Sequence, residues 1–259
     1  SLHFIVFDLL PVQRPDWFLP AIHPRFLLWL NTVIAVADGL HAISRSVADD
    51  LRDYLQTHDP ARLAALHLGH FHLGADLAAS LPSTHLPAEA GPVLATLRRR
   101  PTLLTVATVE PRKGHAQTLA ACERLWAEGH DFNLVFVGKP GWMVETLTER
   151  LRRHPEQGRR FFWLSGISDR YLEAVYAAAA GLLAVSEGEG FGLPLIEAAQ
   201  HQRPLLARDL PVFREVAGPH ATWFSGTDPA ALAAALAARL PRLPAGTAPT
   251  TAGLPWLSW

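Results

Sequence analysis

Two glutamates flank a glycine-rich turn in the second half of the chain. Glu189 and Glu197 have seven residues between them, and the intervening sequence reads Gly-Phe-Gly-Leu-Pro-Leu-Ile. Pro194 suits the start of a helix, where its missing N–H costs nothing. The backbone N–H groups of 190–193 would then point out of a helix N-terminus and favour a phosphate. A carboxylate at Glu197, about one turn into the helix, could accept hydrogen bonds from two sugar hydroxyls. The pattern predicts a nucleoside diphosphate held at this turn.

Hydrophobic periodicity predicts the elements that position this turn. The apolar run 181–185 before it is typical of a buried parallel strand. Across 101–216, short apolar strands alternate with amphipathic helices. We expect strands at 103–107, 133–137, 161–164, 182–185 and 204–207, and helices at 115–128, 143–153, 169–180 and 194–201. Repeated β–α units predict a parallel sheet with helices on both faces, which binds ligands beyond the carboxyl ends of its strands.

A second block of reactive residues follows the first of these strands. Its sequence, Thr-Val-Ala-Thr-Val-Glu-Pro-Arg-Lys-Gly-His, places Arg112 and Lys113 in a loop after a strand. An Arg-Lys pair in such a loop, taken alone, is most often a solvated turn. The two motifs in this order, however, resemble the signature of retaining GT-B glycosyltransferases, glycosyltransferase family 4 in particular. The resemblance runs through most of residues 1–240 and is strongest at 103–218.

The resemblance implies an α/β fold of the GT-B type. A doubly wound Rossmann-like donor domain would follow a partial N-terminal Rossmann-like domain. We expect a partial acceptor-side domain at 1–80, a linker at 81–101, a nucleotide-sugar donor-binding domain at 102–240 and a tail at 241–259. Residues 1–80 resemble only the last part of the family's N-terminal domain, and the family's final helix is not recognised. The chain is therefore expected to be truncated at both ends relative to its family.

The resemblance also implies roles for the residues of both motifs. Arg112 and Lys113 match the basic pair that meets the donor diphosphate, and Glu197 matches the glutamate that binds the ribose hydroxyls. Glu189 is placed at the sugar ring near the anomeric carbon, either as a nucleophile or as a positioning group. For Glu197 a local alternative stays open, because the helix macrodipole favours a glutamate at a helix start without any ligand.

Further candidates come from loops at the same edge of the sheets. Asp8 resembles the family's strand-end aspartate that contacts the acceptor, although many relatives have histidine at the position of Phe7, and a turn cap is the local alternative. Six residues are expected to line the donor site: Gly190, Phe191, Gly192, Leu193, Gly138 and Ile167. Nearby, we expect Asp169 to be the N-cap of its helix and Tyr176 to pack in the core.

The sequence contains no Asp-x-Asp motif of the kind that would hold a divalent cation. Glu187-x-Glu189 is the nearest match, but its glycine-rich surroundings suit a phosphate-binding backbone better than magnesium. The 13 histidines show no metal-binding spacing with a partnering acid. We therefore expect metal-independent transfer without a cofactor, from a GDP- or UDP-linked sugar, with the basic pair in place of the cation.

Composition limits the classes of protein. The chain has 259 residues, is 49% hydrophobic and 18% charged, and carries a formal net charge of −1, so it can bury a core and is a poor partner for nucleic acid. Cys122 is the sole cysteine, which is typical of a reducing compartment. The apolar run 26–37 is too short for a bilayer span of ~20 residues, and no basic signal-peptide segment is seen. We expect a cytoplasmic protein that is peripheral to the inner face of the membrane. The arginines at 98–100 and at 150, 152 and 153 are expected to be solvated, with contact to anionic membrane lipid or to a phosphate-bearing acceptor as the alternative.

These observations together predict a retaining hexosyltransferase. It would transfer a hexose, with mannose as the specific candidate, to a glycan or lipid-linked glycan acceptor in surface polysaccharide synthesis. A catalytically incompetent nucleotide-binding fragment is the alternative. A dinucleotide oxidoreductase is disfavoured, because the glycines at 188, 190 and 192 lack the G-x-G-x-x-G spacing.

Overall fold

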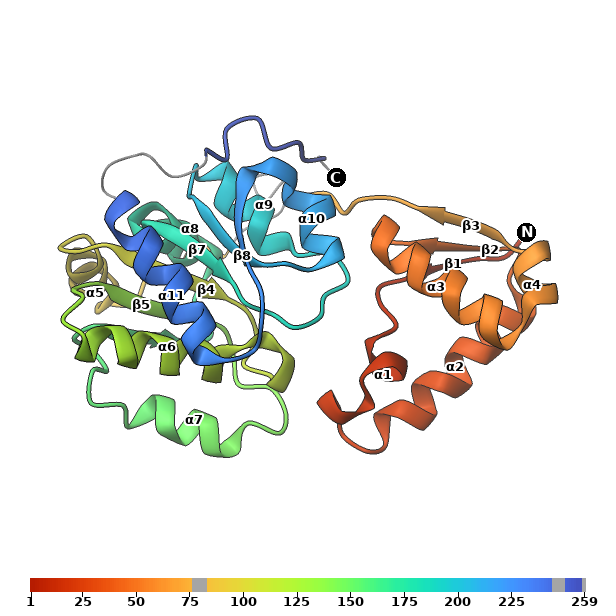
Figure 1. Cartoon of the computed structure of the whole chain (residues 1–259), viewed down its shortest axis with the longest axis horizontal. Coiled ribbons are helices and arrows are strands. Elements are labelled where there is room, and N and C mark those ends of the chain that lie inside the picture. Colours follow the sequence, from red (N-terminus) through yellow and green to blue (C-terminus); the bar gives the residue numbers. More distant parts are fainter. Residues whose placement is uncertain (76–82, 244–249, 258–259) are drawn as a thin grey trace.

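A computed structural model of the chain describes residues 1–75, 83–243 and 250–257 and contains two parallel β-sheets (Figure 1). Residues 1–75 form an N-terminal lobe, and residues 83–243 form a C-terminal lobe beside it. Parts of the expected linker and tail, at 76–82, 244–249 and 258–259, lie outside the described residues. The α/β fold expected from the sequence is confirmed.

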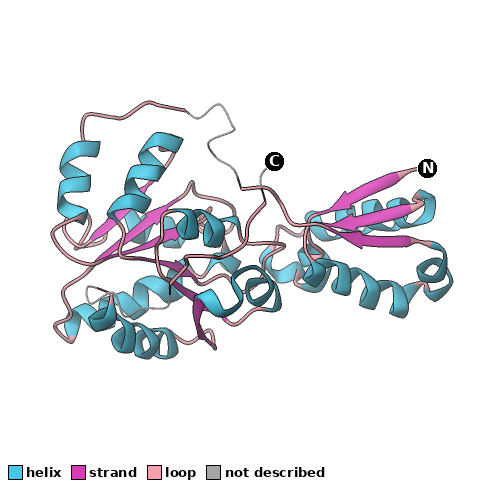
Figure 2. Cartoon of the chain, turned by 90° about the horizontal axis from the view of Figure 1, so that it is seen from above, coloured by secondary structure: helices cyan, strands magenta, loops and turns pink. Residues whose placement is uncertain are grey.

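The N-terminal lobe is a three-stranded sheet in the order β1-β2-β3, with all strands parallel (Figure 2). Its strands are β1 (His3–Val6), β2 (Gly39–Ala42) and β3 (His67–His70), and its helices are α1 (Leu10–Gln13), the 3-10 turn η1 (Pro15–Trp17), α2 (Ile22–Val36), α3 (Arg45–His58) and α4 (Pro60–Ala65). Leu30, Leu40 and Leu51 join α2, β2 and α3 in one buried cluster. Both α2 and α3 therefore pack against this sheet.

The C-terminal lobe is a six-stranded sheet in the order β6-β5-β4-β7-β8-β9, again fully parallel. The strands are β4 (Thr102–Val106), β5 (Asn133–Val137), β6 (Phe161–Leu164), β7 (Gly181–Ala184), β8 (Leu205–Arg208) and β9 (Ala221–Phe224). The helices are α5 (Ala90–Leu97), α6 (His115–Ala127), α7 (Glu145–Arg152), α8 (Asp169–Ala178), α9 (Leu193–Gln200), α10 (Pro211–Ala217) and α11 (Pro229–Arg239), with 3-10 turns η3 (Pro111–Lys113), η4 (Gly218–His220) and η5 (Leu240–Arg242). Every strand and helix expected at 103–207 is present, with its ends displaced by at most two residues.

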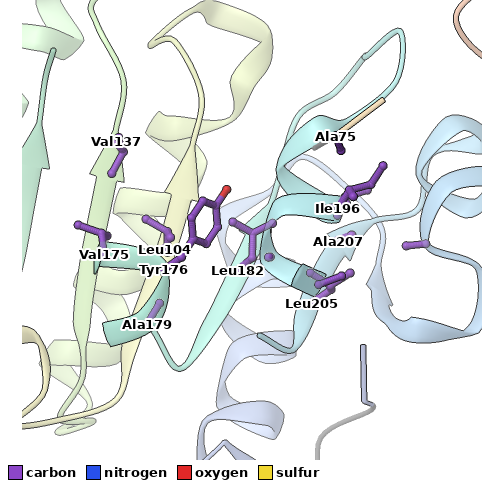
Figure 3. Packing of buried hydrophobic residues seen from close by; sticks show 14 of the residues in the cluster. Ala75, Leu104, Val137, Val175, Tyr176, Ala179, Leu182, Ile196, Leu205 and Ala207 are labelled. Atoms are coloured by element: carbon purple, nitrogen blue, oxygen red, sulfur yellow. The ribbon is translucent and has the colours of Figure 1, made fainter. Parts of the chain in front are cut away.

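Two hydrophobic clusters cover opposite faces of the larger sheet. One joins Leu104 and Leu182 of the sheet to Tyr176 of α8 and Ile196 of α9, as Figure 3 shows, and it also includes residues of α5 and α10. The other contains buried residues of α6, α7 and α11. Because helices cover both faces, a central strand such as β5 is buried at all five positions and reads as a continuous apolar run. The sheet is doubly wound.

The strand order of the larger sheet reverses next to β4. From β4 the chain moves outward through β5 and β6, and it then returns to β7 on the other side of β4. Ligands of doubly wound sheets bind in the crevice at such a switch point. The loop after β4 contains Arg112, and the loop after β7 contains Glu189. The two sequence motifs therefore follow the two strands that border the crevice.

Two expectations about secondary structure need correction. The predicted linker contains helix α5, whose residues Ala90, Leu94 and Leu97 are buried in the core beside α8. These residues have the i, i+4, i+7 spacing of an amphipathic helix, which the Pro- and Arg-rich surroundings obscured. The series of β–α units also continues beyond 207 through α10, β9 and α11. In the described part of the tail, the Ala75 N–H donates to the Leu257 carbonyl at 2.9 Å.

The longest helix, α2, has 15 residues. Among the residues that the structure describes, no helix is both long enough and apolar enough to span a membrane.

Candidate active site

A glycine places the basic pair beside the end of β7. Arg112 and Lys113 lie in η3, which follows β4, and Gly114 then starts α6 with a φ of +71°. A Cβ at Gly114 would lie 2.5 Å from the Val185 carbonyl oxygen. The close approach and the left-handed backbone both require glycine. The turn thus brings both cations against the loop that contains Glu189.

Glu189 forms ion pairs with both cations. Its Oε1 lies 2.5 Å from Lys113 Nζ, and its Oε2 lies 3.2 Å from an Arg112 guanidinium nitrogen, which also donates to the Gly188 carbonyl at 2.7 Å. The three side chains are only 13–15% exposed. Burial alone would raise the pKa of Glu189, but Lys113 and Arg112 bring it below its usual value. Glu189 is therefore an ionised carboxylate that occupies the cations in the ligand-free chain.

Two further carboxyl groups belong to this cluster. Arg112 Nε lies 3.3 Å from Oε2 of Glu110, which is buried. Asp8, after β1, lies within electrostatic reach of Arg112, Lys113 and Glu189. Burial raises the pKa of both Asp8 and Glu110, and this outweighs the lowering by the cations. The cluster therefore holds three carboxyl groups against two cations.

Asp8 also has the local role that the sequence left open. Its Oδ1 accepts the Leu10 N–H at 3.1 Å, which is a turn cap at the start of α1. A turn cap and an acceptor contact are compatible roles for Asp8, because one carboxylate oxygen caps the turn while the carboxyl group lies in the electrostatic field of Arg112 and Lys113. Glu110 was missed, although it stands in the same block as Arg112, because the sequence does not reveal that its side chain is buried.

Glu197 occupies a separate environment in α9. The Tyr176 hydroxyl donates to its Oε2 at 2.7 Å, and burial raises the pKa of Glu197. Within the described ranges, no ion pair joins Glu197 to the Glu189 cluster. Tyr176 is 1% exposed, so its expected core position is confirmed. Its hydrogen bond to Glu197 was not foreseen, because the two residues belong to different elements.

Close backbone approaches explain the glycines that were expected to line the donor site. A Cβ at Gly190 would lie 2.1 Å from the Phe7 carbonyl oxygen, and one at Gly138 would lie 1.9 Å from the Ala107 carbonyl oxygen. Gly192 precedes α9 with a φ of +107°. The structure therefore places Gly190, Phe191, Gly192 and Leu193 at the N-terminal end of α9, while Gly138 directly follows β5. Their contact with a donor remains a prediction.

The N-cap of α8 differs from the expectation. Ser168, not Asp169, caps this helix, because the Ser168 hydroxyl accepts the Tyr171 N–H at 3.2 Å and the Ser168 backbone is extended. Asp169 is already helical and instead accepts the backbone N–H and the hydroxyl of Ser83 at 2.8 Å each. Ile167, one of the six residues expected to line the donor site, precedes this cap and is partly buried against the core.

Two aromatic residues of the N-terminal lobe, Trp17 and Phe18, contact the Glu189 loop and the loop after β5. The Trp17 ring would lie 2.7 Å from a Cβ at Gly188, and the Trp142 indole donates to the Trp17 carbonyl at 2.8 Å. The rings of Phe18 and Trp142 stack with centroids 5.8 Å apart. These contacts join the N-terminal lobe to the Glu189 loop and to the loop after β5, and they were not predicted. For metal ions, the described residues contain no group of three or more His, Cys, Asp or Glu suited to binding one.

His115, at the start of α6, is expected to make the stability of the folded chain depend on pH. It is buried, and burial together with the charge of Lys113 lowers its pKa from 6.5 to about 3. The unfolded chain therefore binds a proton below pH 6.5 that the folded chain does not, so stability is lost as the pH falls. Between pH 7.5 and 5 this amounts to about 2 kcal/mol. Urea unfolding of the wild type and of His115→Leu should differ by this amount in pH dependence; parallel pH profiles would contradict it.

The C-terminal lobe, which contains both motifs, matches a known family of proteins. The family model described as "Glycosyl transferases group 1" matches residues 93–240, which is more than half of the chain. The chain belongs to this family. Both motifs of this group 1 glycosyltransferase, at 105–115 and 186–197, lie within the matched region.

Relatives of this group 1 glycosyltransferase are named mannosyltransferases. It is 46% identical over 258 residues to "Serotype-specific mannosyltransferase WbdA" of Escherichia coli, covering 99% of this chain and 32% of that protein. It is also 33% identical over 135 residues to "O-antigen chain mannosyltransferase B" of Escherichia coli, covering 51% of this chain and 35% of the relative. The chain thus spans about a third of the length of these relatives.

Solved structures of similar shape have the GT-B fold. Anabaena Alr3699/HepE in complex with UDP and glucose matches with a TM-score of 0.70 at 16% identity, over 98% of this chain and 65% of that one. Sucrose-phosphate synthase from Thermosynechococcus elongatus matches with a TM-score of 0.70 at 22% identity, over 96% of this chain and 60% of that one. The GT-B type expected for this group 1 glycosyltransferase is therefore confirmed.

Proposed function

We propose that this chain is the donor-binding part of a retaining family 4 hexosyltransferase, with residues 102–240 as the donor domain and 1–80 on the acceptor side. The observation that supports this most is the pairing of Arg112 and Lys113 with Glu189 at the switch point of the sheet. Two cations at the mouth of the crevice suit a diphosphate leaving group, because fixed positive charge stabilises the charge that develops on it. The mannosyltransferase relatives favour mannose as the sugar.

The mechanism follows from competition for the two cations. The donor diphosphate, linked to guanosine or uridine, takes the places that Glu189 occupies on Lys113 and Arg112. Glu189 is then available to the sugar ring, where it positions and stabilises, and Glu197 accepts hydrogen bonds from the ribose. The bond from the anomeric carbon to the phosphate oxygen breaks as the acceptor oxygen bonds to that carbon on the same face. The departing phosphate accepts the acceptor's proton, and Asp8 contacts the acceptor.

The wider setting belongs to the same proposal. We infer a glycan or lipid-linked glycan acceptor in surface polysaccharide synthesis, since one relative is named an O-antigen chain mannosyltransferase. The proposed location is cytoplasmic with peripheral contact to the inner face of the membrane, and no nucleic acid partner or cofactor is needed. A chain that binds nucleotide without turnover is the second candidate, favoured by its coverage of about a third of its relatives.

Glu197→Ala is expected to weaken nucleoside diphosphate binding by ~1–3 kcal/mol, the scale of hydrogen bonds to a charged group. The measurement is calorimetric titration with GDP, UDP and ADP, first without metal and then with magnesium. Tyr176→Phe is the matched variant, because it removes the hydrogen bond to Glu197 and keeps the ring in the core; it should give a smaller loss. Equal affinities for wild type and Glu197→Ala would remove the ribose role, and binding that required magnesium would refute metal independence.

A further inference from the structure

The N-terminal end of α3 lies against the turn that follows Glu189. Ser44 is the N-cap of this 14-residue helix, and its hydroxyl oxygen accepts the Val47 N–H at 3.1 Å. The same hydroxyl donates to the Gly190 carbonyl at 2.8 Å. One hydroxyl can do both, because it has one donor and two acceptor positions. Ser44 is fully buried, so this contact between the lobes is shielded from water.

A carboxylate of the C-terminal lobe binds the same helix end. Glu215, in α10, accepts the Arg45 N–H at 2.7 Å on Oε1 and the Ser46 N–H at 2.8 Å on Oε2. His72 Nε2 also lies 2.7 Å from Oε1. A negative charge is favoured at a helix N-terminus, and the first-turn N–H groups of α3 would otherwise lack acceptors. The two lobes are therefore joined by hydrogen bonds to backbone groups. The strength of these bonds depends closely on how the two lobes are placed.

The dipeptide Gly190-Phe191 is held from the N-terminal lobe on several sides. The Phe7 carbonyl leaves no room for a Cβ at Gly190, and the His72 ring meets the Phe191 ring edge-on with centroids 5.2 Å apart. Ser44 binds the carbonyl of Gly190, directly after Glu189 in the chain. In contrast, Glu197 is held by Tyr176 within the C-terminal lobe. The sugar side of the predicted site thus depends on the other lobe, whereas the ribose side does not.

We propose that Ser44 and Glu215 are positioning residues that hold the Glu189 turn in place for the donor sugar when α3 is docked. Docking of the N-terminal lobe and assembly of the sugar site are then one event. This inference rests on the proposed function, since it takes Glu189 to face the sugar. The simpler reading, in which Ser44 and Glu215 only stabilise α3, predicts no difference between a nucleotide and a nucleotide-sugar.

The test compares a nucleotide with the corresponding nucleotide-sugar, for two such pairs, across four variants. Dissociation constants are measured for GDP and GDP-mannose, and for UDP and UDP-glucose, with wild type, Ser44→Ala, Ser44→Thr, Glu215→Gln and Asp228→Ala. Asp228 caps α11 by accepting the Ala230 N–H and is distant in sequence from both motifs, so it is the matched loss of a helix cap. We expect Ser44→Ala and Glu215→Gln to weaken the nucleotide-sugar about tenfold and the nucleotide less than about twofold. Ser44→Thr should restore wild-type affinity, and Asp228→Ala should change neither constant.

Hydrogen–deuterium exchange gives a readout that needs no ligand. The amides of 187–193 should exchange several-fold faster in Ser44→Ala and Glu215→Gln than in wild type, and at the wild-type rate in Asp228→Ala. Unchanged exchange, or a parallel loss of affinity for nucleotide and nucleotide-sugar, would overturn the inference. If exchange rose as expected but the wild type bound neither nucleotide, the proposed function would be wrong. Ser44 would then only join the two lobes. Its role in positioning Glu189 for the donor sugar would be refuted together with the proposed function.

Discussion

Lys113→Ala is expected to lower turnover by about 10²–10³-fold, while the affinity for the donor falls far less. In the ligand-free chain Lys113 Nζ already has a partner, Glu189 Oε1 at 2.5 Å. In the proposed mechanism, donor binding exchanges this carboxylate for a phosphate, so the net gain in binding free energy in the ground state is small. As the bond to the anomeric carbon breaks, negative charge develops on the phosphate. The nearby Lys113 ammonium then stabilises the transition state more than the ground state. The loss therefore appears mainly in the rate constant.

Steady-state kinetics with GDP-mannose and a mannoside acceptor would separate the two effects, with calorimetry as the independent measure of affinity. Lys139→Ala is the matched control, because Lys139 is the only other lysine and lies in the loop after β5; it should leave turnover within a few-fold of wild type. Lys113→Arg keeps the charge and should retain more activity than Lys113→Ala. Normal turnover by Lys113→Ala would remove this residue from the mechanism.

Gly138→Ala is expected to destabilise the C-terminal lobe by about 3 kcal/mol, at the upper end of the usual cost of overpacking. The added Cβ would lie 1.9 Å from the Ala107 carbonyl oxygen and 3.1 Å from the Thr108 nitrogen. These atoms cannot move freely, because the Ala107 N–H donates to the Val137 carbonyl and the Gly138 N–H donates to the Leu164 carbonyl, each at 3.0 Å. Relief of the clash must therefore break hydrogen bonds at the carboxyl ends of β4, β5 and β6.

Urea unfolding followed by circular dichroism measures this change, with the midpoint as the readout. Gly91→Ala is the control, since Gly91 lies in α5 and an added Cβ there would meet nothing within 4 Å. That variant should be neutral or slightly stabilising, because alanine is the better helix former. A Gly138→Ala protein with the midpoint of wild type would show that the strand ends adapt, and would weaken the explanation for glycine at this position.

Local pattern was sufficient for the elements of the larger sheet between residues 102 and 208, but not for α10, β9 and α11 beyond them. Strands such as β5 are buried on both faces and are short, so they appear in the sequence as continuous apolar runs between helical segments. The turn before α9 was likewise predicted from the sequence, because glycine and proline have strong local conformational preferences. Helix α5 was missed, since its Pro- and Arg-rich surroundings resemble a connection and only its burial against α8 reveals its role.

The sequence by itself therefore determined the β–α series, the two motifs and the residue types that could meet a diphosphate. Only the tertiary structure decided which of those residues meet. Arg112 and Glu189 are 77 positions apart, and they pair because β7 returns beside β4. Ser44 and Gly190 are 146 apart and meet because the lobes dock at α3. The raised pKa values of Asp8, Glu110 and Glu197 likewise come from burial, which depends on how distant segments pack together and not on the local sequence.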